Sequence, residues 1–273
     1  MVQTKTAIGA ALAGAFVLGA IAIGYSSAQP KSNMPTVQKE TLETSFSELQ
    51  EEEIGEIIRA YLMDNPEVII EAVNAYSLEQ RMAAVERTKV AAAENLPLLL
   101  DATSSFVAGK NPAAAKVAVI EMYDYHCGYC KRATPLVNDL LKKDSDVKVV
   151  FRELPILKQE SGYAAEMALA ARDQGKFLEF HFAMMDASGT LTKDRVDELA
   201  RKHGLDVAKM NALIDSGEIP TMIEENHQMA ADLGIDGTPA FIIASVDGKY
   251  IDVVTGFDPD TIEAKIKEAK AAR

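Results

Sequence analysis

The spacing of apolar residues changes several times along this chain of 273 residues. An uncharged run from Ala7 to Gly24 comes first, and amphipathic helical spacing follows from about residue 45. A short apolar run rich in β-branched residues begins at Val117, and helical spacing returns over residues 161–233. Two further apolar runs then precede a last helical stretch. Strand and helix periods in this order predict an α/β domain behind a helical N-terminal segment.

The N-terminal segment predicts two consecutive helices. Ser45 and Glu48 have the spacing of a capping box, in which the two side chains satisfy free backbone amides. The apolar residues that follow at helical spacing are Leu49, Ile54, Ile57, Ile58, Tyr61 and Leu62. Asn65 as N-cap and Pro66 at the first helical position then begin a second helix, which extends to about Ala93.

The second helix is long, and little of its own chain is nearby to cover its apolar residues. These are Val68, Ile69, Ile70, Val73, Tyr76, Met82 and Val85. They must dock either on the downstream domain or on another copy of the chain, and we favour an oligomerisation stalk. No heptad pattern is sustained for several repeats, so a regular coiled coil is not predicted.

The first strand of the downstream domain leads directly into a pair of cysteines. Residues 117–123 form a nearly continuous apolar run, which predicts a buried strand. Apolar residues at helical spacing over 131–143 predict a helix, and a second strand is expected over 147–157. Cys127 and Cys130 therefore lie at the first turn of a βαβ unit, where a strand gives way to a helix.

The spacing of these cysteines predicts redox chemistry. Two cysteines three residues apart on the first turn of a helix can form a disulfide and reopen it. The free amides and the dipole of the helix stabilise a thiolate on Cys127, so Cys127 is the expected nucleophile and Cys130 the resolving thiol. The alternative is a pair of structural cysteines or half of a metal site, which the strand-to-helix context disfavours.

Two neighbouring residues are candidates for tuning this pair. His126 precedes Cys127 and, when charged, would favour its thiolate, whereas the alternative is a histidine that only fills the strand end. Glu121 is an acid inside an apolar strand, where burial would raise its pKa. It is a candidate proton relay to Cys130, and the alternative is an edge position that reaches solvent. His181 lies between two phenylalanines and is expected to pack in a helix core.

The C-terminal part of the domain follows the long helical stretch. Thr238 and Pro239 open an apolar strand, where the proline cannot donate to the ladder and marks a bend or an edge. Asp247 and Gly248 carry the turn signal of an antiparallel hairpin. Pro259 then begins a last helix, which runs to about Ala271.

The composition of the chain is acidic. The net charge is −13, with 41 acidic against 28 basic residues, which argues against nucleic-acid binding.

The N-terminus predicts export. Residues 1–28 have the layout of a secretory signal, with cleavage expected after Ala28, and residues 29–44 are a polar linker. The alternative is an uncleaved membrane anchor. Either way the chain is exported to a compartment where disulfides form.

These features resemble the DsbA-like branch of the thioredoxin fold, over about Phe106 to Arg273. The residues that carry the resemblance are Cys127-Gly128-Tyr129-Cys130 and Thr238-Pro239. In that family the proline has a cis peptide bond, lies beside the disulfide and helps to hold the substrate chain. The resemblance implies these properties for Pro239 and its neighbour Thr238. Glu121, six positions before Cys127, corresponds to the family's buried acid.

One departure bears on the direction of the reaction. The strong oxidases of the family have a histidine inside the motif, where this chain has Tyr129. Gly128 with Tyr129, and Thr238 before the proline, are more similar to the periplasmic disulfide isomerases. The N-terminal segment resembles the stalk of suppressor-of-copper-sensitivity C proteins, some of which form trimers and isomerise disulfides.

The sequence therefore predicts a thioredoxin fold with a helical insertion, preceded by a helical oligomerisation segment. The expected organisation is a signal peptide at 1–28, a linker at 29–44, a helical segment at 45–100 and a thioredoxin domain at 101–273 with its insertion at 161–233. The expected function is a cofactor-free periplasmic thiol-disulfide oxidoreductase, mainly an isomerase or reductase. A monomeric oxidase is the alternative, and a copper-binding metal-tolerance protein is a third. Expected partners are exported proteins with cysteines, a membrane redox partner and further copies of the chain, but not nucleic acid.

Overall fold

The computed structural model describes residues 46–272, which belong to two compact units. One unit ends at Asp64 and the other begins at Asn65. The expected signal peptide (1–28) and linker (29–44), and Ser45 of the expected capping box, lie outside the described residues. The expected boundary between residues 100 and 101 stays a prediction. Within residues 46–272, no helix is both long enough and apolar enough to cross a bilayer.

The first unit contains helix α1 (Glu48–Asp64). The helix begins at Glu48, so this residue is at the first helical position rather than the third, and the expected capping box is displaced. Ser47 and Gln50 make the cap, since the backbone N–H of Ser47 donates to Gln50 Oε1 at 3.0 Å. No residue of α1 is buried, and its apolar side chains, such as Leu49 and Ile57, are exposed.

Helix α2 (Pro66–Glu94) opens the second unit and has two different ends. Its C-terminal end packs on the domain, where Thr88 and Ala92 are buried and Lys89 Nζ lies 3.8 Å from Asp252 Oδ1. The apolar side chains from Val68 to Met82 remain exposed. The end of the helix therefore docks on its own domain, as one of the two expectations had it, whereas the oligomerisation stalk stays a prediction.

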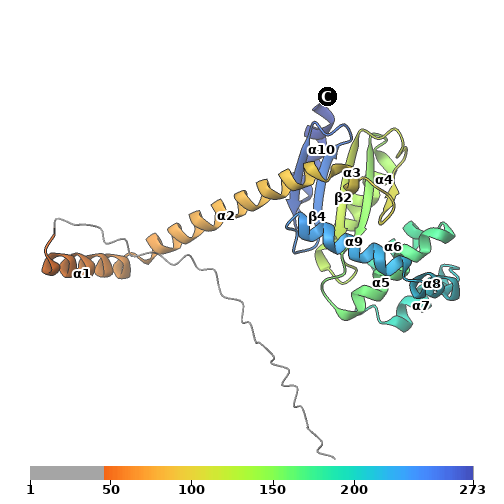
Figure 1. The fold of residues 1–273 in the computed structure, drawn as a ribbon, viewed down its shortest axis with the longest axis horizontal. Coiled ribbons are helices and arrows are strands. Elements are labelled where there is room, and N and C mark those ends of the chain that lie inside the picture. Colours follow the sequence, from red (N-terminus) through yellow and green to blue (C-terminus); the bar gives the residue numbers. More distant parts are fainter. Residues whose placement is uncertain (1–45, 273) are drawn as a thin grey trace, which may run out of the picture. The chain divides into compact units, whose positions relative to one another are not determined.

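A five-stranded sheet forms the centre of the second unit (Figure 1). Its strands are β1 (Phe106–Ala108), β2 (Val117–Tyr123), β3 (Val147–Glu153), β4 (Ala240–Ser245) and β5 (Ile251–Thr255). They lie in the order β1-β3-β2-β4-β5. β2 and β3 are parallel, and the other three pairs are antiparallel. Every residue of the central strand β2 is buried.

Two details of the sheet differ from the expectation. β3 ends at Glu153 rather than near residue 157, because the carboxylate of Asp124 accepts the backbone N–H groups of Ile156 and Leu157, both at 2.9 Å. These amides are thereby withdrawn from any strand pairing. β1 was not predicted, because three residues give too short a pattern for a strand to be recognised.

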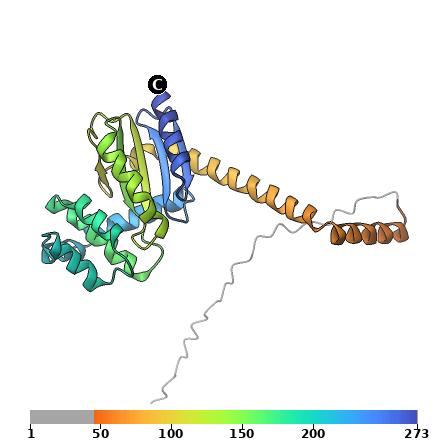
Figure 2. The ribbon, with the colours of Figure 1, turned by 180° about the vertical axis from the view of Figure 1, so that it is seen from behind.

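Helices cover both faces of the sheet (Figures 1 and 2). α4 (Gly128–Lys143) and α10 (Pro259–Ala271) pack on one face. The end of α2, α3 (Leu96–Leu99) and α9 (Glu218–Asp232) pack on the other. The insertion between β3 and β4 consists of α5 (Gln159–Ala170), η1 (Ala171–Gln174), α6 (Phe177–Asp186), α7 (Lys193–Lys202), α8 (Val207–Asp215) and α9 (Glu218–Asp232). This is the thioredoxin fold with a helical insertion that the sequence predicts.

Candidate active site

Cys127 and Cys130 lie where β2 gives way to α4. Cys127 is the N-cap residue of α4, and its Sγ accepts the backbone N–H of Cys130 at 3.3 Å. Both cysteines are free thiols. The Cys127 thiol also donates to the backbone carbonyl of Thr238 at 3.2 Å. The fold therefore brings the cysteine pair together with Thr238 and Pro239, which are more than 100 residues away in the sequence.

The other residues of the two motifs frame this pair. The peptide bond between Thr238 and Pro239 is cis. Gly128 is the first residue of α4, and Tyr129 is 56% exposed beside it. The guanidinium of Arg132 lies 3.9 Å from the centre of the Tyr129 ring. An exposed aromatic ring next to the thiols is thus available for contact with another molecule.

The two thiols have opposite electrostatic environments. The hydrogen bond from the Cys130 thiol, supported by the Cys130 N–H, lowers the pKa of Cys127 to about 6. Burial is the main cause that raises the pKa of Cys130 far above that of a free thiol. At neutral pH Cys127 is therefore largely a thiolate, whereas Cys130 keeps its proton. This asymmetry suits a nucleophile and a resolving thiol.

We predict that alkylation of the reduced protein follows the ionisation of Cys127. The rate with iodoacetamide should be half-maximal near pH 6, because only the thiolate reacts and its fraction falls as the pH drops below the pKa. Rates between pH 4 and 9, with the modified residue identified by mass spectrometry, measure this. A midpoint above pH 8, or preferential modification of Cys130, would contradict it.

Glu121 is buried in the central strand beneath these thiols. Its pairing partners are Phe151 on β3 and Phe241 on β4, and its side chain is only 2% exposed. The alternative of an edge position that reaches solvent is therefore wrong. Burial, and to a smaller extent the charge of Cys127, raise the pKa of Glu121 to about 8. The group can hold a proton at neutral pH close to the cysteines.

We predict that Glu121→Gln stabilises the protein at alkaline pH. The folded state keeps the Glu121 proton up to about pH 8, whereas the unfolded chain loses it near 4.5, so the wild type loses stability as the pH rises between these values. This loss in the free energy of unfolding of the wild type is on the order of 4 kcal/mol, and the variant does not show it. Urea unfolding of both proteins at pH 5 and pH 9 measures it, with Glu198→Gln on the exposed side of α7 as control. Equal pH dependence in wild type and variant would contradict the prediction.

His126 has a different role from the one expected. Its Nε2 accepts the backbone N–H of Leu191 at 2.9 Å, and its Nδ1 lies 2.9 Å from Ser161 Oγ. A ring that accepts at Nε2 is not an imidazolium, and burial lowers the pKa of His126. The expectation of a charged histidine that favours the Cys127 thiolate is therefore corrected. His126 instead connects the active-site turn to the helical insertion.

Asp124 is a site residue that the sequence analysis missed. This carboxylate is buried, and besides the Ile156 and Leu157 amides it accepts the backbone N–H of His126 at 2.7 Å and the Ser161 hydroxyl at 2.9 Å. It thus joins the active-site turn to the loop after β3 and to α5. An acid directly after a buried strand and before the cysteines was the available signal.

Across residues 46–272, no group of three or more His, Cys, Asp or Glu side chains is placed to hold a metal ion.

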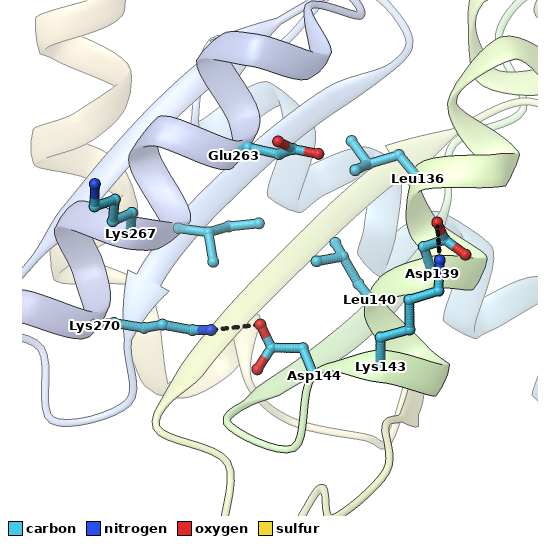
Figure 3. A pocket seen from close by; sticks show the side chains of 9 residues that line it. Leu136, Asp139, Leu140, Lys143, Asp144, Glu263, Lys267 and Lys270 are labelled. Atoms are coloured by element: carbon cyan, nitrogen blue, oxygen red, sulfur yellow. Dashed lines mark hydrogen bonds and ion pairs between the residues drawn. The ribbon is translucent and has the colours of Figure 1, made fainter.

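A groove lies between α4 and α10. Its floor includes Leu136 and Leu140, and its rim has ion pairs such as Lys270 to Asp144 (Figure 3). This groove lies at the C-terminal end of α4, opposite the cysteines, and none of its lining residues is a thiol.

Comparisons with known families match two parts of the chain. Residues 118–267 match the DSBA-like thioredoxin domain, and residues 50–84 match the Copper resistance protein ScsC N-terminal domain. The first match includes both cysteines, Glu121 and the Thr238-Pro239 pair. The second covers most of α1 and the exposed part of α2.

Individual relatives agree with these matches. The Na(+)/H(+) antiporter NhaA 1 of Salinispora arenicola is 31% identical over 49% of this chain and 21% of its own length. The thiol:disulfide interchange protein DsbA of Bordetella pertussis is 28% identical over 50% of this chain and 66% of its own length. The chain thus spans less than two thirds of either relative.

Solved structures give the same picture. A thioredoxin-like oxidoreductase from Silicibacter pomeroyi is 35% identical and covers 64% of this chain and 97% of its own, with a TM-score of 0.58. Proteus mirabilis ScsC in a transitional conformation is 27% identical and covers 83% of this chain and 99% of its own, with a TM-score of 0.59. The second similarity extends over more of the chain than the first.

Proposed function

The chain belongs to the DsbA-like thioredoxin domain family, and from this membership we propose that it is a periplasmic thiol-disulfide oxidoreductase that acts mainly as an isomerase or reductase. The observation that carries the proposal is the pair of unequal thiols at the start of α4. The Cys127 thiolate attacks a substrate disulfide, forms a mixed disulfide with one of its two sulfur atoms and releases the other as a thiol. Cys130 then loses its proton and attacks Cys127, which releases the substrate thiol and leaves the Cys127–Cys130 disulfide.

The environment of Cys127 supports an isomerase or reductase over a strong oxidase. A thiolate that is strongly stabilised favours the reduced enzyme and makes the disulfide more oxidising. The pKa of about 6 at Cys127 lies closer to the ~7 of thioredoxin than to the ~3.5 of the strong oxidase DsbA. Tyr129 occupies the position of the oxidases' histidine, and His126 is neutral, so neither adds a positive charge.

The surroundings of Cys127 support a role in holding the substrate chain. Thr238 lies beside the nucleophile, since the Cys127 thiol donates to the Thr238 carbonyl at 3.2 Å. A substrate segment beside Cys127 would lie against Thr238 and Pro239, with Gly128 and the exposed ring of Tyr129 on the other side. Glu121 is the proposed proton relay for Cys130 during resolution: its ionised form raises the pKa of this thiol and can accept its proton.

The exposed apolar helices support a homo-oligomer in which several catalytic domains share one stalk. The apolar side chains of α1 and of the first part of α2 are unburied, and this segment matches the ScsC N-terminal domain. Burial of these side chains against further copies would remove apolar surface from water. Several active sites in one assembly suit isomerisation, because one can hold a misfolded chain while another attacks it. A membrane redox partner would reset the active site.

Refolding of a scrambled disulfide protein tests the proposal. The full chain should restore activity to scrambled ribonuclease in a reducing glutathione buffer and should oxidise reduced, unfolded ribonuclease only slowly. Strong oxidation of the reduced substrate without isomerisation would instead establish an oxidase. Light scattering that gives a monomer mass would argue for the monomeric alternative.

The match to a copper resistance protein favours one second candidate, which is binding of Cu(I) by the two thiolates. Soft sulfur ligands select Cu(I). Anaerobic titration of the reduced chain with Cu(I) in the presence of a competing chelator tests it. Binding of well under one ion per chain would count against this candidate.

A further inference from the structure

A second buried acid, Glu153, lies at the end of β3 and belongs to a hydrogen-bonded cluster that the exchange chemistry does not use. The cluster contains Tyr123 at the end of β2, Tyr125 in the active-site turn and His181 on α6. All four side chains are at most 2% exposed. Three separate elements and the active-site turn thus meet in one polar group inside an apolar core.

The hydrogen bonds form a chain through Tyr125. The Tyr123 hydroxyl donates to Glu153 Oε1 at 2.5 Å, and the Tyr125 oxygen lies 3.1 Å from the same Oε1 and 2.9 Å from His181 Nδ1. Tyr125 has one hydroxyl hydrogen and can donate to only one of these two atoms. The other contact therefore requires a hydrogen on either Glu153 or His181 Nδ1.

The burial of the cluster decides the charge states of its members. Burial lowers the pKa of His181 to about 3, so its ring is neutral, and burial raises the pKa of Glu153 well above its usual range. The hydrogen bonds from Tyr123 and Tyr125 oppose this increase in the pKa of Glu153, and the charges of Asp124 and Glu121 add to it. Glu153 Oε2 has no partner among the described residues, so an ionised carboxylate would keep an unsatisfied buried oxygen. The chain is satisfied if a neutral His181 donates from Nδ1 to Tyr125, which donates to Glu153, or if a neutral Glu153 donates to Tyr125, which donates to His181.

The cluster acts on the turn that carries Cys127. The backbone N–H of Cys127 donates to the Asp124 carbonyl at 3.0 Å, so residues 124–127 form one tight turn. The Asp124 carboxylate attaches this turn to the loop after β3. The Tyr125 hydroxyl attaches it to Glu153 and to α6.

We propose that Glu153 is a positioning residue for thiol exchange, which through Tyr125 holds the active-site turn in the geometry that presents Cys127. The inference rests on the proposed role of Cys127 as nucleophile. The alternative is that the cluster contributes only to core packing. Modification of Cys127 by a small reagent separates the two, because it reports on the thiolate without any substrate turnover.

The test compares four variants of the full chain in the pH dependence of iodoacetamide alkylation of Cys127. Tyr125→Phe removes one hydroxyl, and Glu153→Leu removes the acid. Each should lower the rate constant at pH 6 by about fivefold, which is the equivalent of one hydrogen bond of ~1 kcal/mol. Glu153→Gln should stay within about twofold of the parent, because the amide oxygen in the place of Oε1 can still accept from Tyr123 and from Tyr125. Tyr163→Phe, which removes a hydroxyl bonded to Asp197 in the insertion, is the matched control and should leave the rate unchanged.

Circular dichroism and thermal unfolding of each variant accompany these rates. If Tyr125→Phe is folded and its profile coincides with that of the parent, the cluster is core packing and the inference is overturned. If Glu153→Gln lowers the alkylation rate as much as Glu153→Leu does, the inference is also overturned. A neutral hydrogen-bonding side chain at this position would then not be enough to hold the turn. Failure of the isomerase assay with an intact alkylation response would contradict the proposed function and leave this inference standing.

Discussion

Cys127→Ser is expected to lower exchange with any disulfide substrate by about three orders of magnitude or more, because a serine hydroxyl is not ionised at neutral pH. Cys130→Ser should behave differently. It keeps the Cys127 nucleophile, so mixed disulfides form, but no thiol is placed to resolve them. This variant should therefore accumulate covalent complexes with substrates, which appear as reducible adducts on non-reducing gels.

The two variants check each other. Both side chains are nearly the size of the native thiol, so the fold should persist, and circular dichroism verifies this. The chain has only two cysteines, so no other thiol can substitute for the missing one. Unimpaired turnover by Cys130→Ser, or adducts formed by Cys127→Ser, would reverse the assigned roles.

Polar substitutions on the exposed face of α2 are expected to separate isomerase activity from thiol chemistry. Ile69, Val73 and Tyr76 are spaced four and three residues apart, so they share one face of the helix, and all three are exposed. Replacing them together by serine should dissociate the proposed oligomer, because their apolar surface drives association. Isomerisation should fall to a small fraction, whereas alkylation of Cys127 should stay unchanged.

Light scattering of the parent and the variant measures the mass, and the scrambled-substrate assay measures the activity. A matched control replaces the polar Glu71 and Asn74 of the same helix, by glutamine and serine respectively. A parent that is already monomeric would remove the basis of this prediction. A dissociated variant with full isomerase activity would show that oligomerisation is not required.

The sequence predicted most of the fold because its signals are local. The period of the apolar residues identified β2, and Asp258 with Pro259 identified the start of α10. The cysteine pair was recognisable because its chemistry depends on its position at a helix start. The early end of β3 was not predictable in this way, because it depends on Asp124, which is more than 30 residues from the amides that it binds.

Contacts between residues distant in the sequence also explain which features of the active site the sequence analysis missed. His126 precedes Cys127 in the sequence, but its protonation depends on Leu191, which lies 65 residues further along. Glu153 ends an ordinary apolar strand, and only the fold shows that it faces Tyr125 and His181. Local patterns indicate which residues are buried, whereas the partners of buried polar groups are set by the tertiary structure.

The difference in pKa between Cys127 and Cys130 also allows one thiol to be labelled selectively for spectroscopy. A reduced chain has two thiol groups, of which Cys127 is ionised near neutral pH and Cys130 is held as a buried, protonated thiol. A thiol-specific spin label or fluorophore at pH 6 to 7 should therefore attach once per chain, at Cys127, without any engineered cysteine. In an assembly of several chains, the distances between these labels would report directly how far apart the catalytic centres lie and how much that separation varies.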